Sequence, residues 1–92
     1  MPQVLVKLYT TLRLRLNQPQ IWVEAATAAD AVGRVAQLGG PEVSRILYDE
    51  QGAVRNEFLL ALGSEILDRN ALDQVRLPEG GVLHIFPPIS GG

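Results

Sequence analysis

Apolar and polar residues alternate near the start of the chain in a way that predicts two strands. Residues 3–9 (QVLVKLY) and residues 20–25 (QIWVEA) are rich in β-branched and aromatic side chains. The segment between them contains the turn formers Asn17 and Pro19, so we expect a hairpin with a long connection. One face of the two strands collects the apolar residues Val4, Val6, Leu8, Ile21 and Val23.

A helical period follows the second strand. Thr27 is the predicted N-cap, and Asp30 stands three residues later in the capping-box position. Gly39, Gly40 and Pro41 are predicted to stop the helix. The buried stripe of this helix is predicted to consist of Ala28, Val32, Val35 and Ala36.

The rest of the chain predicts shorter elements and, with the earlier ones, an α+β fold of the β-grasp type. We expect a mixed sheet of four to five strands packed on one main helix, in the order β-β-α-β-(β)-β. The expected segments are a helical turn in 41–50, a turn at 49–53, a buried strand at 57–62, a short strand and turn in 63–72, a loop at 77–81 and a last strand at 82–86.

The predicted strands carry more apolar surface than one helix can cover. A second face holds Leu5, Tyr9 and Trp22, and in the last strand Val82, His84 and Phe86 alternate with Leu83 and Ile85. An apolar surface on the outer side of a small domain suggests a partner surface. Loops that cover this face are the alternative, and the pattern leaves both open.

Composition excludes several classes of function. With 92 residues, 47% of them hydrophobic, the chain is expected to form a single globular domain. The net charge of −2 argues against general nucleic-acid binding, and the lack of cysteine excludes thiol catalysis and thiolate metal sites. We recognise neither a signal peptide nor an apolar run of bilayer length, so a cytoplasmic location without membrane attachment is expected.

The last six residues, PPISGG, are unusual for a domain that only has to fold. Glycine makes up about 7% of average sequence, so a Gly-Gly end occurs by chance about once in 200 chains. Two prolines keep the chain extended, and glycines can thread a narrow channel. The predicted tail therefore consists of Pro87, Pro88, Ile89, Ser90, Gly91 and Gly92.

The candidate reactive group is the terminal carboxylate of Gly92. Coupling a carboxylate to AMP makes an acyl donor, from which a sulfur nucleophile leaves a thiocarboxylate and an amine forms an amide. Neither route needs a catalytic side chain on the carrier, which suits a chain without cysteine. The alternative is a glycine-rich end without function.

The loop LPEGG, the strand VLHIF and the ending PPISGG resemble the MoaD/ThiS family of ubiquitin-like sulfur carriers. The sequence FPPISGG is most similar to the small subunit of molybdopterin synthase. The resemblance implies a β-grasp domain over residues 1–86 and an extended tail over residues 87–92. It also implies that Tyr9 and Phe86 lie on the partner surface.

The resemblance further implies the partners. An adenylyltransferase similar to ubiquitin activators (MoeB/ThiF-like) would use ATP to activate Gly92, and a sulfur donor enzyme would supply the sulfur. The tail would then insert into the large subunit of molybdopterin synthase (MoaE-like) and donate sulfur to a pterin precursor. The chain itself would be a non-catalytic carrier subunit that binds no cofactor and no metal.

The sequence also departs from the family pattern. Leu62-Gly63 stands where members often have Asn-Gly, and residues 46–58 have no clear counterpart in the shortest carriers. These departures leave other sulfur acceptors open: thiamine, tRNA thiolation and cysteine synthesis. A protein modifier and an inert ubiquitin-like binding module also remain alternatives, although the single lysine, Lys7, disfavours a modifier that forms chains of itself.

Other chemistry-bearing residues have simpler interpretations. His84 is expected to be a packed or half-exposed strand residue rather than a ligand. Asp49 and Glu50 are expected to be solvated in a turn. Arg13 and Arg15 alternate with leucines and are expected to share one polar face. Trp22 is expected in the core or at a rim, with an interface hot spot as the alternative, and Gly80-Gly81 is expected to be a turn.

Overall fold

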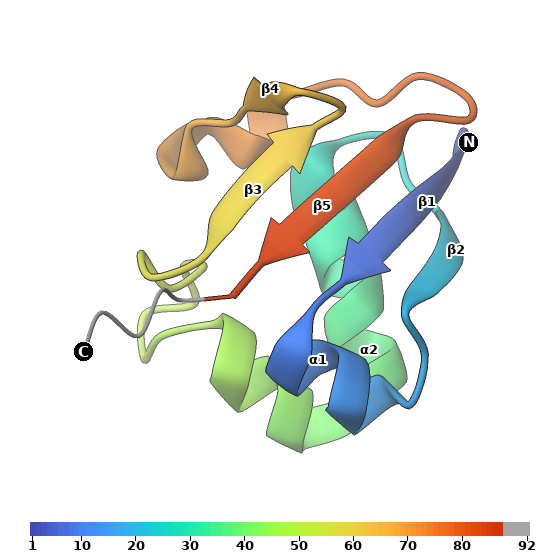
Figure 1. Cartoon of the computed structure of the whole chain (residues 1–92). Helices are drawn as coiled ribbons and strands as arrows, with labels where there is room; N and C mark the ends of the chain where they lie inside the picture. The colour runs from blue at the N-terminus through green and yellow to red at the C-terminus, as the bar shows by residue number, and fades with distance from the viewer. Residues whose placement is uncertain (88–92) are drawn as a thin grey trace.

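The computed structural model describes residues 1–87, which form one five-stranded sheet with a long helix packed across it (Figure 1). The strand order is β2-β1-β5-β3-β4; β1 and β5 are parallel at the centre, and the other pairs are antiparallel. The elements are β1 (Gln3–Leu8), α1 (Thr10–Leu16), β2 (Gln20–Glu24), α2 (Ala28–Leu47), β3 (Leu59–Leu62), β4 (Glu65–Ile66), the 3-10 helix η1 (Arg69–Gln74) and β5 (Val82–Phe86). The predicted α+β architecture is confirmed.

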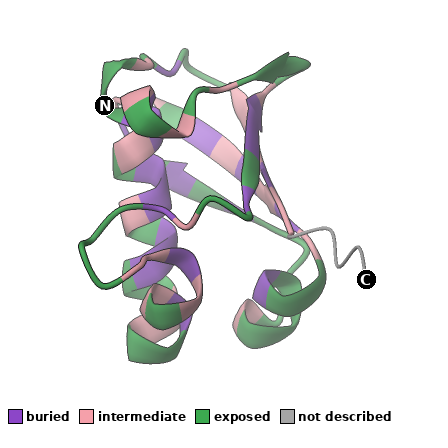
Figure 2. Cartoon of the chain, turned by 90° about the vertical axis from the view of Figure 1, so that its left-hand side faces the viewer, coloured by how far each residue is buried: buried purple, intermediate pink, exposed green. Residues whose placement is uncertain are grey.

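The hydrophobic core lies between one face of the sheet and α2 (Figure 2). Alternation along β1 and β5 places every second side chain on this face, as the sequence predicted. Burial of apolar surface of this kind is the main source of stability in such a domain. The fully buried larger side chains are Leu8, Leu12, Leu47, Leu60, Leu83, Ile85, Val4, Val6, Val32, Val35 and Val43.

Helix α2 begins where the sequence predicts and is interrupted where the sequence predicts a stop. The Thr27 side chain accepts a hydrogen bond from the Asp30 backbone N–H at 3.2 Å, which confirms the N-cap. Gly40 adopts a non-helical conformation with a φ of 78°, and a second helical segment runs from Pro41 to Leu47. The predicted stop is therefore a kink between two helical segments, and Pro41, a residue tolerated in the first turn of a helix, begins the helical turn predicted in 41–50.

The predicted long connection between the first two strands contains helix α1. Leu12 is buried against the core, whereas Leu14 is 80% exposed, so the leucines do not share one face. Asn17 ends the helix in the left-handed conformation with a φ of 58°. Residues two apart on a helix point in different directions, so the expectation that Arg13 and Arg15 share a polar face is also wrong.

The remaining turns agree with the sequence. Asp49 accepts hydrogen bonds from the backbone N–H groups of Gln51 and Ala53, and Gly52 has a φ of 82° in the same turn. The loop before β5 turns at Gly80, which has a φ of 77°. Among residues 1–87, every helix falls short of the length and apolar character that crossing a bilayer requires.

Candidate functional site

The candidate site begins at the end of β5, the strand that leads toward the predicted tail. Phe86 is the last residue of β5, and Pro87 is the last residue that the structure describes. Because β5 lies between β1 and β3, the chain leaves the sheet from its centre (Figure 1). Pro88, Ile89, Ser90, Gly91 and Gly92 lie outside the described residues, so their predicted roles stay predictions.

Three aromatic rings stack on the outer side of the sheet beside this exit. The ring centroids of Tyr9 and Phe86 are 4.9 Å apart, and those of His84 and Phe86 are 5.3 Å apart. The Tyr9 hydroxyl also lies 2.9 Å from Nδ1 of His84. The sequence predicted Tyr9 and Phe86 on one surface, and the structure brings them into contact. His84 completes the cluster, although the sequence predicted it only as a packed or half-exposed strand residue.

Local backbone geometry directs Tyr9 toward this cluster. Tyr9 precedes α1 in an extended conformation, so its side chain continues the alternation of β1. The chain then turns sharply at Thr10, which has a φ of 43°. Tyr9 makes no side-chain capping bond, because tyrosine is not one of the short polar residues that cap helices. Its hydroxyl bonds to His84 on β5 instead.

The environment of His84 keeps its imidazole neutral at neutral pH. Desolvation lowers the pKa of His84, and the positive charge of Lys7 lowers it further. Lys7 lies opposite His84 in the parallel register of β1 and β5. When the Tyr9 hydroxyl donates to Nδ1 of the neutral imidazole, Nε2–H is left as a donor. This polar pair lies within a largely apolar surface.

That surface extends over the whole outer face of the sheet. Trp22 is 58% exposed, Leu59 44% and Ile66 59%. The explanation that loops cover this face is therefore wrong for these residues, and so is a core position for Trp22. Paired strand positions that face outward are Leu5, Lys7, Gln20, Trp22, Leu59, Ala61, Ile66, Val82, His84 and Phe86.

A hollow of 330 Å³ lies beside the exit of β5 and contains Tyr9 and Pro87 in its lining. Its walls combine the buried Phe58 with Arg45 and Arg55, and the Arg55 Nε donates a hydrogen bond to the Arg45 carbonyl at 3.2 Å. The sequence analysis did not predict this hollow. It forms only because the second half of α2 continues past the kink.

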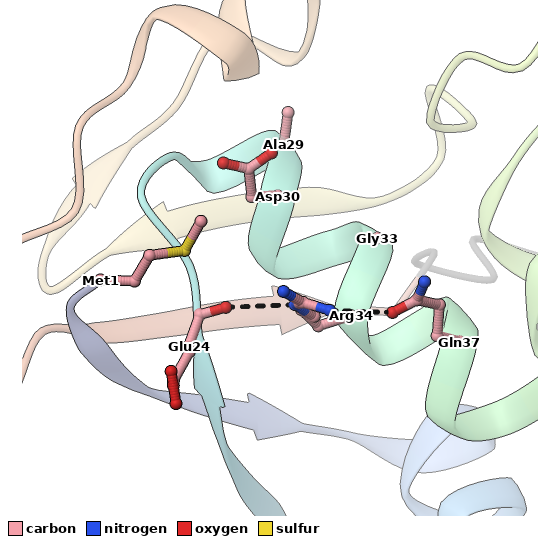
Figure 3. Close-up of a pocket in the computed structure, with 7 residues that line it drawn as sticks. All are labelled: Met1, Glu24, Ala29, Asp30, Gly33, Arg34 and Gln37. Carbon is pink, nitrogen blue, oxygen red and sulfur yellow. Dashed lines mark hydrogen bonds between the residues drawn. The ribbon is translucent and has the colours of Figure 1, made fainter.

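A second hollow, of 280 Å³, lies between β2 and α2 (Figure 3). Figure 3 shows Arg34 between two acceptors: its Nε donates to the Glu24 carbonyl at 3.2 Å and its Nη1 to Gln37 Oε1 at 3.3 Å. The first bond joins the helix to the edge strand β2, and the second links two residues of α2. We therefore assign Arg34 a structural role.

The other sequence candidates have structural roles as well. Among residues 1–87 no group of three potential metal ligands comes together, so His84 has no companions for a metal site there. Asp49 stabilises its own turn, and the backbone N–H groups of Ala53 and Gln51 hold its pKa below the ordinary value. Arg15 forms an exposed ion pair with Glu42 of α2.

No protein-family model matches the sequence, and no curated protein matches it. Solved structures do match. SAMP1 of Haloferax volcanii aligns with a TM-score of 0.83 at 20% identity, over 98% of this chain and 99% of that one. A putative molybdopterin converting factor subunit 1 of Pyrococcus furiosus aligns with a TM-score of 0.71 at 18% identity, over 97% and 100%.

The chain has the β-grasp fold. A third match is a chain in the BexX/CysO complex of Amycolatopsis orientalis, with a TM-score of 0.78 at 19% identity over 97% of this chain and 99% of that one. At these identities the likeness establishes the β-grasp architecture, and function has to be argued from the site. The relevant features are the aromatic cluster, the open sheet face and the sequence that follows β5.

Proposed function

We propose that the chain is a sulfur carrier whose Gly92 carboxylate is adenylated and then converted to a thiocarboxylate. The observation that carries the proposal is the sequence Phe-Pro-Pro-Ile-Ser-Gly-Gly directly after the central strand of a β-grasp fold. The proposal takes Gly92 as the carboxyl terminus. The solved structures that support it include one described as a putative molybdopterin converting factor subunit and one from a complex that contains CysO.

The chemistry requires activation because a carboxylate is anionic and resonance-stabilised, and hence a poor electrophile. In the proposed reaction a Gly92 oxygen attacks the α-phosphorus of ATP, and pyrophosphate leaves. Hydrosulfide released by a sulfur donor enzyme then attacks the acyl carbon, AMP leaves, and the thiocarboxylate remains. The adenylyltransferase supplies the catalytic groups for these steps, so the carrier only has to present its end.

The outer face of the sheet would be the surface that the adenylyltransferase binds. Tyr9 and Phe86 are stacked beside the root of the tail, so a partner that contacts them is close to the end of the chain. Rigid aromatic residues in a well-packed cluster are frequent anchors of protein interfaces. Trp22, on the far side of the same face, would extend the contact.

The proposed pathway is molybdopterin synthesis, with the chain as the small subunit of the synthase. Support comes from the FPPISGG ending and from the match to the putative molybdopterin converting factor subunit. The tail would insert into the large subunit and donate sulfur to a pterin precursor. Thiamine, tRNA and cysteine synthesis are the alternative destinations of the same sulfur.

A second candidate function is covalent modification of other proteins. It is favoured by the similarity to SAMP1, which is described as a small archaeal modifier protein. In this case the activated Gly92 would form an amide with a lysine of the target. The chain itself offers one lysine, Lys7, so it would modify targets singly rather than as a polymer.

Intact mass of the untagged chain tests the proposal. The chain is incubated with its adenylyltransferase, ATP and a sulfur donor, and the expected mass change is one oxygen replaced by sulfur. A chain that lacks Gly92 should show no change. Gly52→Ala, a substitution in an exposed turn that is remote in sequence from Gly92, should react normally. No change in the intact chain with an active adenylyltransferase would refute the carrier function.

Reconstitution with the large subunit tests the pathway. If the thiocarboxylate form converts a pterin precursor to its dithiolene product, the synthase role is established. If the activated chain instead appears as conjugates on lysines of added proteins, the modifier function replaces it. These two readouts separate the candidates, because only the first requires sulfur in the product.

A further inference from the structure

Lys7 lies on the open sheet face, and the strand register of residues 1–87 places no acidic residue beside it. In the sheet register it stands beside His84 of β5 on one side and Gln20 of β2 on the other. Among residues 1–87, Lys7 forms no ion pair and no side-chain hydrogen bond. The nearest acidic residue in the register of β1 and β2 is Glu24, which pairs with Gln3. Gln3 lies four positions from Lys7, or about 13 Å along the strand.

The surroundings of Lys7 on this face are otherwise apolar. Two positions back along β1, the outward-facing side chains across the sheet are Leu5, Trp22 and Val82. Level with Lys7, the strands beyond His84 contribute Ala61 and Ile66. A partner that covers this face removes water from the ammonium group. Burial of an ammonium group without a counter-charge is costly, and pairing it with a hydrogen-bonded carboxylate offsets that cost.

His84 adds a second donor at the same position. Its Nδ1 lies against the Tyr9 hydroxyl, so Nε2 is the ring nitrogen left to bond outward, and it carries the proton when the hydroxyl donates to Nδ1. Lys7 and His84 are close enough for the lysine charge to affect the histidine. Two neighbouring donors, one of them charged, together fit the oxygens of one carboxylate.

We propose that the partner of this face presents an apolar surface with one buried Asp or Glu, whose carboxylate binds Lys7 and His84. This inference rests on the proposed function, since the partner is the adenylyltransferase that activates Gly92. It adds a specificity contact to the aromatic anchors Tyr9 and Phe86. A partner with the apolar patch but without the acid is rejected, because Lys7 then stays buried and unpaired.

Substitution of Lys7 tests the proposal, because a weaker or a stronger affinity for the partner distinguishes whether a carboxylate lies opposite the lysine. Binding of the purified adenylyltransferase is measured by calorimetry at low and high salt. With a carboxylate opposite, Lys7→Met weakens binding about tenfold or more, Lys7→Glu weakens it further, and the salt dependence decreases for Lys7→Met. Without one, Lys7→Met leaves binding equal or tighter, because a desolvated charge has been removed.

Matched controls keep this result specific. Glu24→Gln changes a charge at the corner of the same face and should alter binding less than twofold. Lys7→Arg keeps the charge and should retain most of the affinity. Each variant is first compared with the original chain by far-UV circular dichroism and urea unfolding, so that lost binding is not lost folding. Equal or tighter binding of Lys7→Met to the adenylyltransferase overturns the proposal.

The single lysine allows a direct chemical test of the same contact. Carbodiimide joins an amine to a carboxylate without a spacer, and the chain offers only Lys7 and the Met1 amino group. In the complex we expect a cross-link from Lys7 to one Asp or Glu of the partner. It should be absent with Lys7→Arg, and peptide mass separates it from any product at Met1. A complex whose only cross-links come from Met1 contradicts the proposal.

The remaining outcomes are distinguishable. If the original chain is adenylated and binds its partner, and Lys7→Met binds with the same affinity, the carboxylate contact is refuted but the proposed function is not. An original chain that does not bind the adenylyltransferase contradicts both. A molar mass that doubles with concentration, and returns to that of a monomer in Trp22→Ala, would assign the face to a second copy of the chain and also refute the proposal.

Discussion

The Tyr9 hydroxyl lies 2.9 Å from Nδ1 of His84, although the two residues are 75 positions apart in the sequence. This bond connects the end of β1 to the middle of β5, the two parallel strands at the centre of the sheet. It also fixes both rings against Phe86 at the point where the chain leaves the domain. The contacts among these three side chains thus hold the aromatic cluster together.

Tyr9→Phe removes this hydrogen bond but keeps the ring. We expect the free energy of unfolding to decrease by about 0.5–1 kcal/mol, because the bond is partly exposed and only the hydroxyl is lost. Urea unfolding followed by Trp22 fluorescence measures the change. His84→Phe removes the same bond from the other side, so the double variant should cost less than the sum of the two single changes. Full additivity would mean that the two side chains do not interact in solution.

The lowered pKa of His84 predicts a pH dependence of stability. Its pKa in the folded chain lies below the unfolded value of about 6.5, so protonation favours the unfolded state. The contribution of His84 is therefore fully present above about pH 6.5 and is lost as the pH falls below that value. Urea unfolding between pH 7.5 and pH 5 should show this decrease in the original chain and a smaller one in His84→Gln. Equal pH profiles would refute the assignment.

The two leucines of α1 test the helix that the sequence did not predict. Leu12 is 1% exposed, so Leu12→Ala should decrease the free energy of unfolding by about 2–4 kcal/mol through lost burial and a residual cavity. Leu14 is 80% exposed, so Leu14→Ala should change it by no more than about 0.5 kcal/mol. Thermal unfolding of the pair gives the comparison. Similar losses would favour an extended connection over a helix.

The sequence predicted the sheet more accurately than the connections, for physical reasons. Strand alternation is a short-range pattern, so the inward positions of β1, β2 and β5 were correct. The segment TTLRLRL alternates in the same way, yet it forms a helix because Leu12 finds a place in the core. That choice depends on tertiary packing, which single-sequence patterns do not contain.

The candidate site was predictable where the chain carries a motif and not where it depends on distant contacts. Phe86 and Pro87 could be placed because they precede the Gly-Gly ending. The pairing of His84 with Tyr9 required the parallel register of β1 and β5, which nothing in either segment specifies. The Arg45–Arg55 hollow required the continuation of α2 past Gly40, since Arg45 lies in the second half of the helix.

The kink in α2 brings Gly39 against Val43, and this contact gives the last prediction. A Cβ atom at Gly39 would clash with Cβ and Cγ2 of Val43, which is 1% exposed and cannot move freely. Gly39→Ala should therefore decrease the free energy of unfolding by about 1–3 kcal/mol, the usual cost of overpacking. Gly52→Ala is the control with a positive φ of 82° but open space around it, and it should show only the smaller cost of backbone strain, about 1 kcal/mol.

Combining the glycine change with Val43→Gly separates a clash from a loss of flexibility. Alanine at this position would not serve, because Cβ of Val43 itself stands in the way of the added atom. Val43→Gly alone removes a buried side chain from the helix and should cost about 2–4 kcal/mol. If the clash is the cause, the double variant relieves it and is more stable than the sum of the two losses predicts. Urea unfolding of the four chains measures the coupling. Strict additivity would mean that Gly39 is required for its backbone conformation, and that the close approach to Val43 does not limit which residue can stand there.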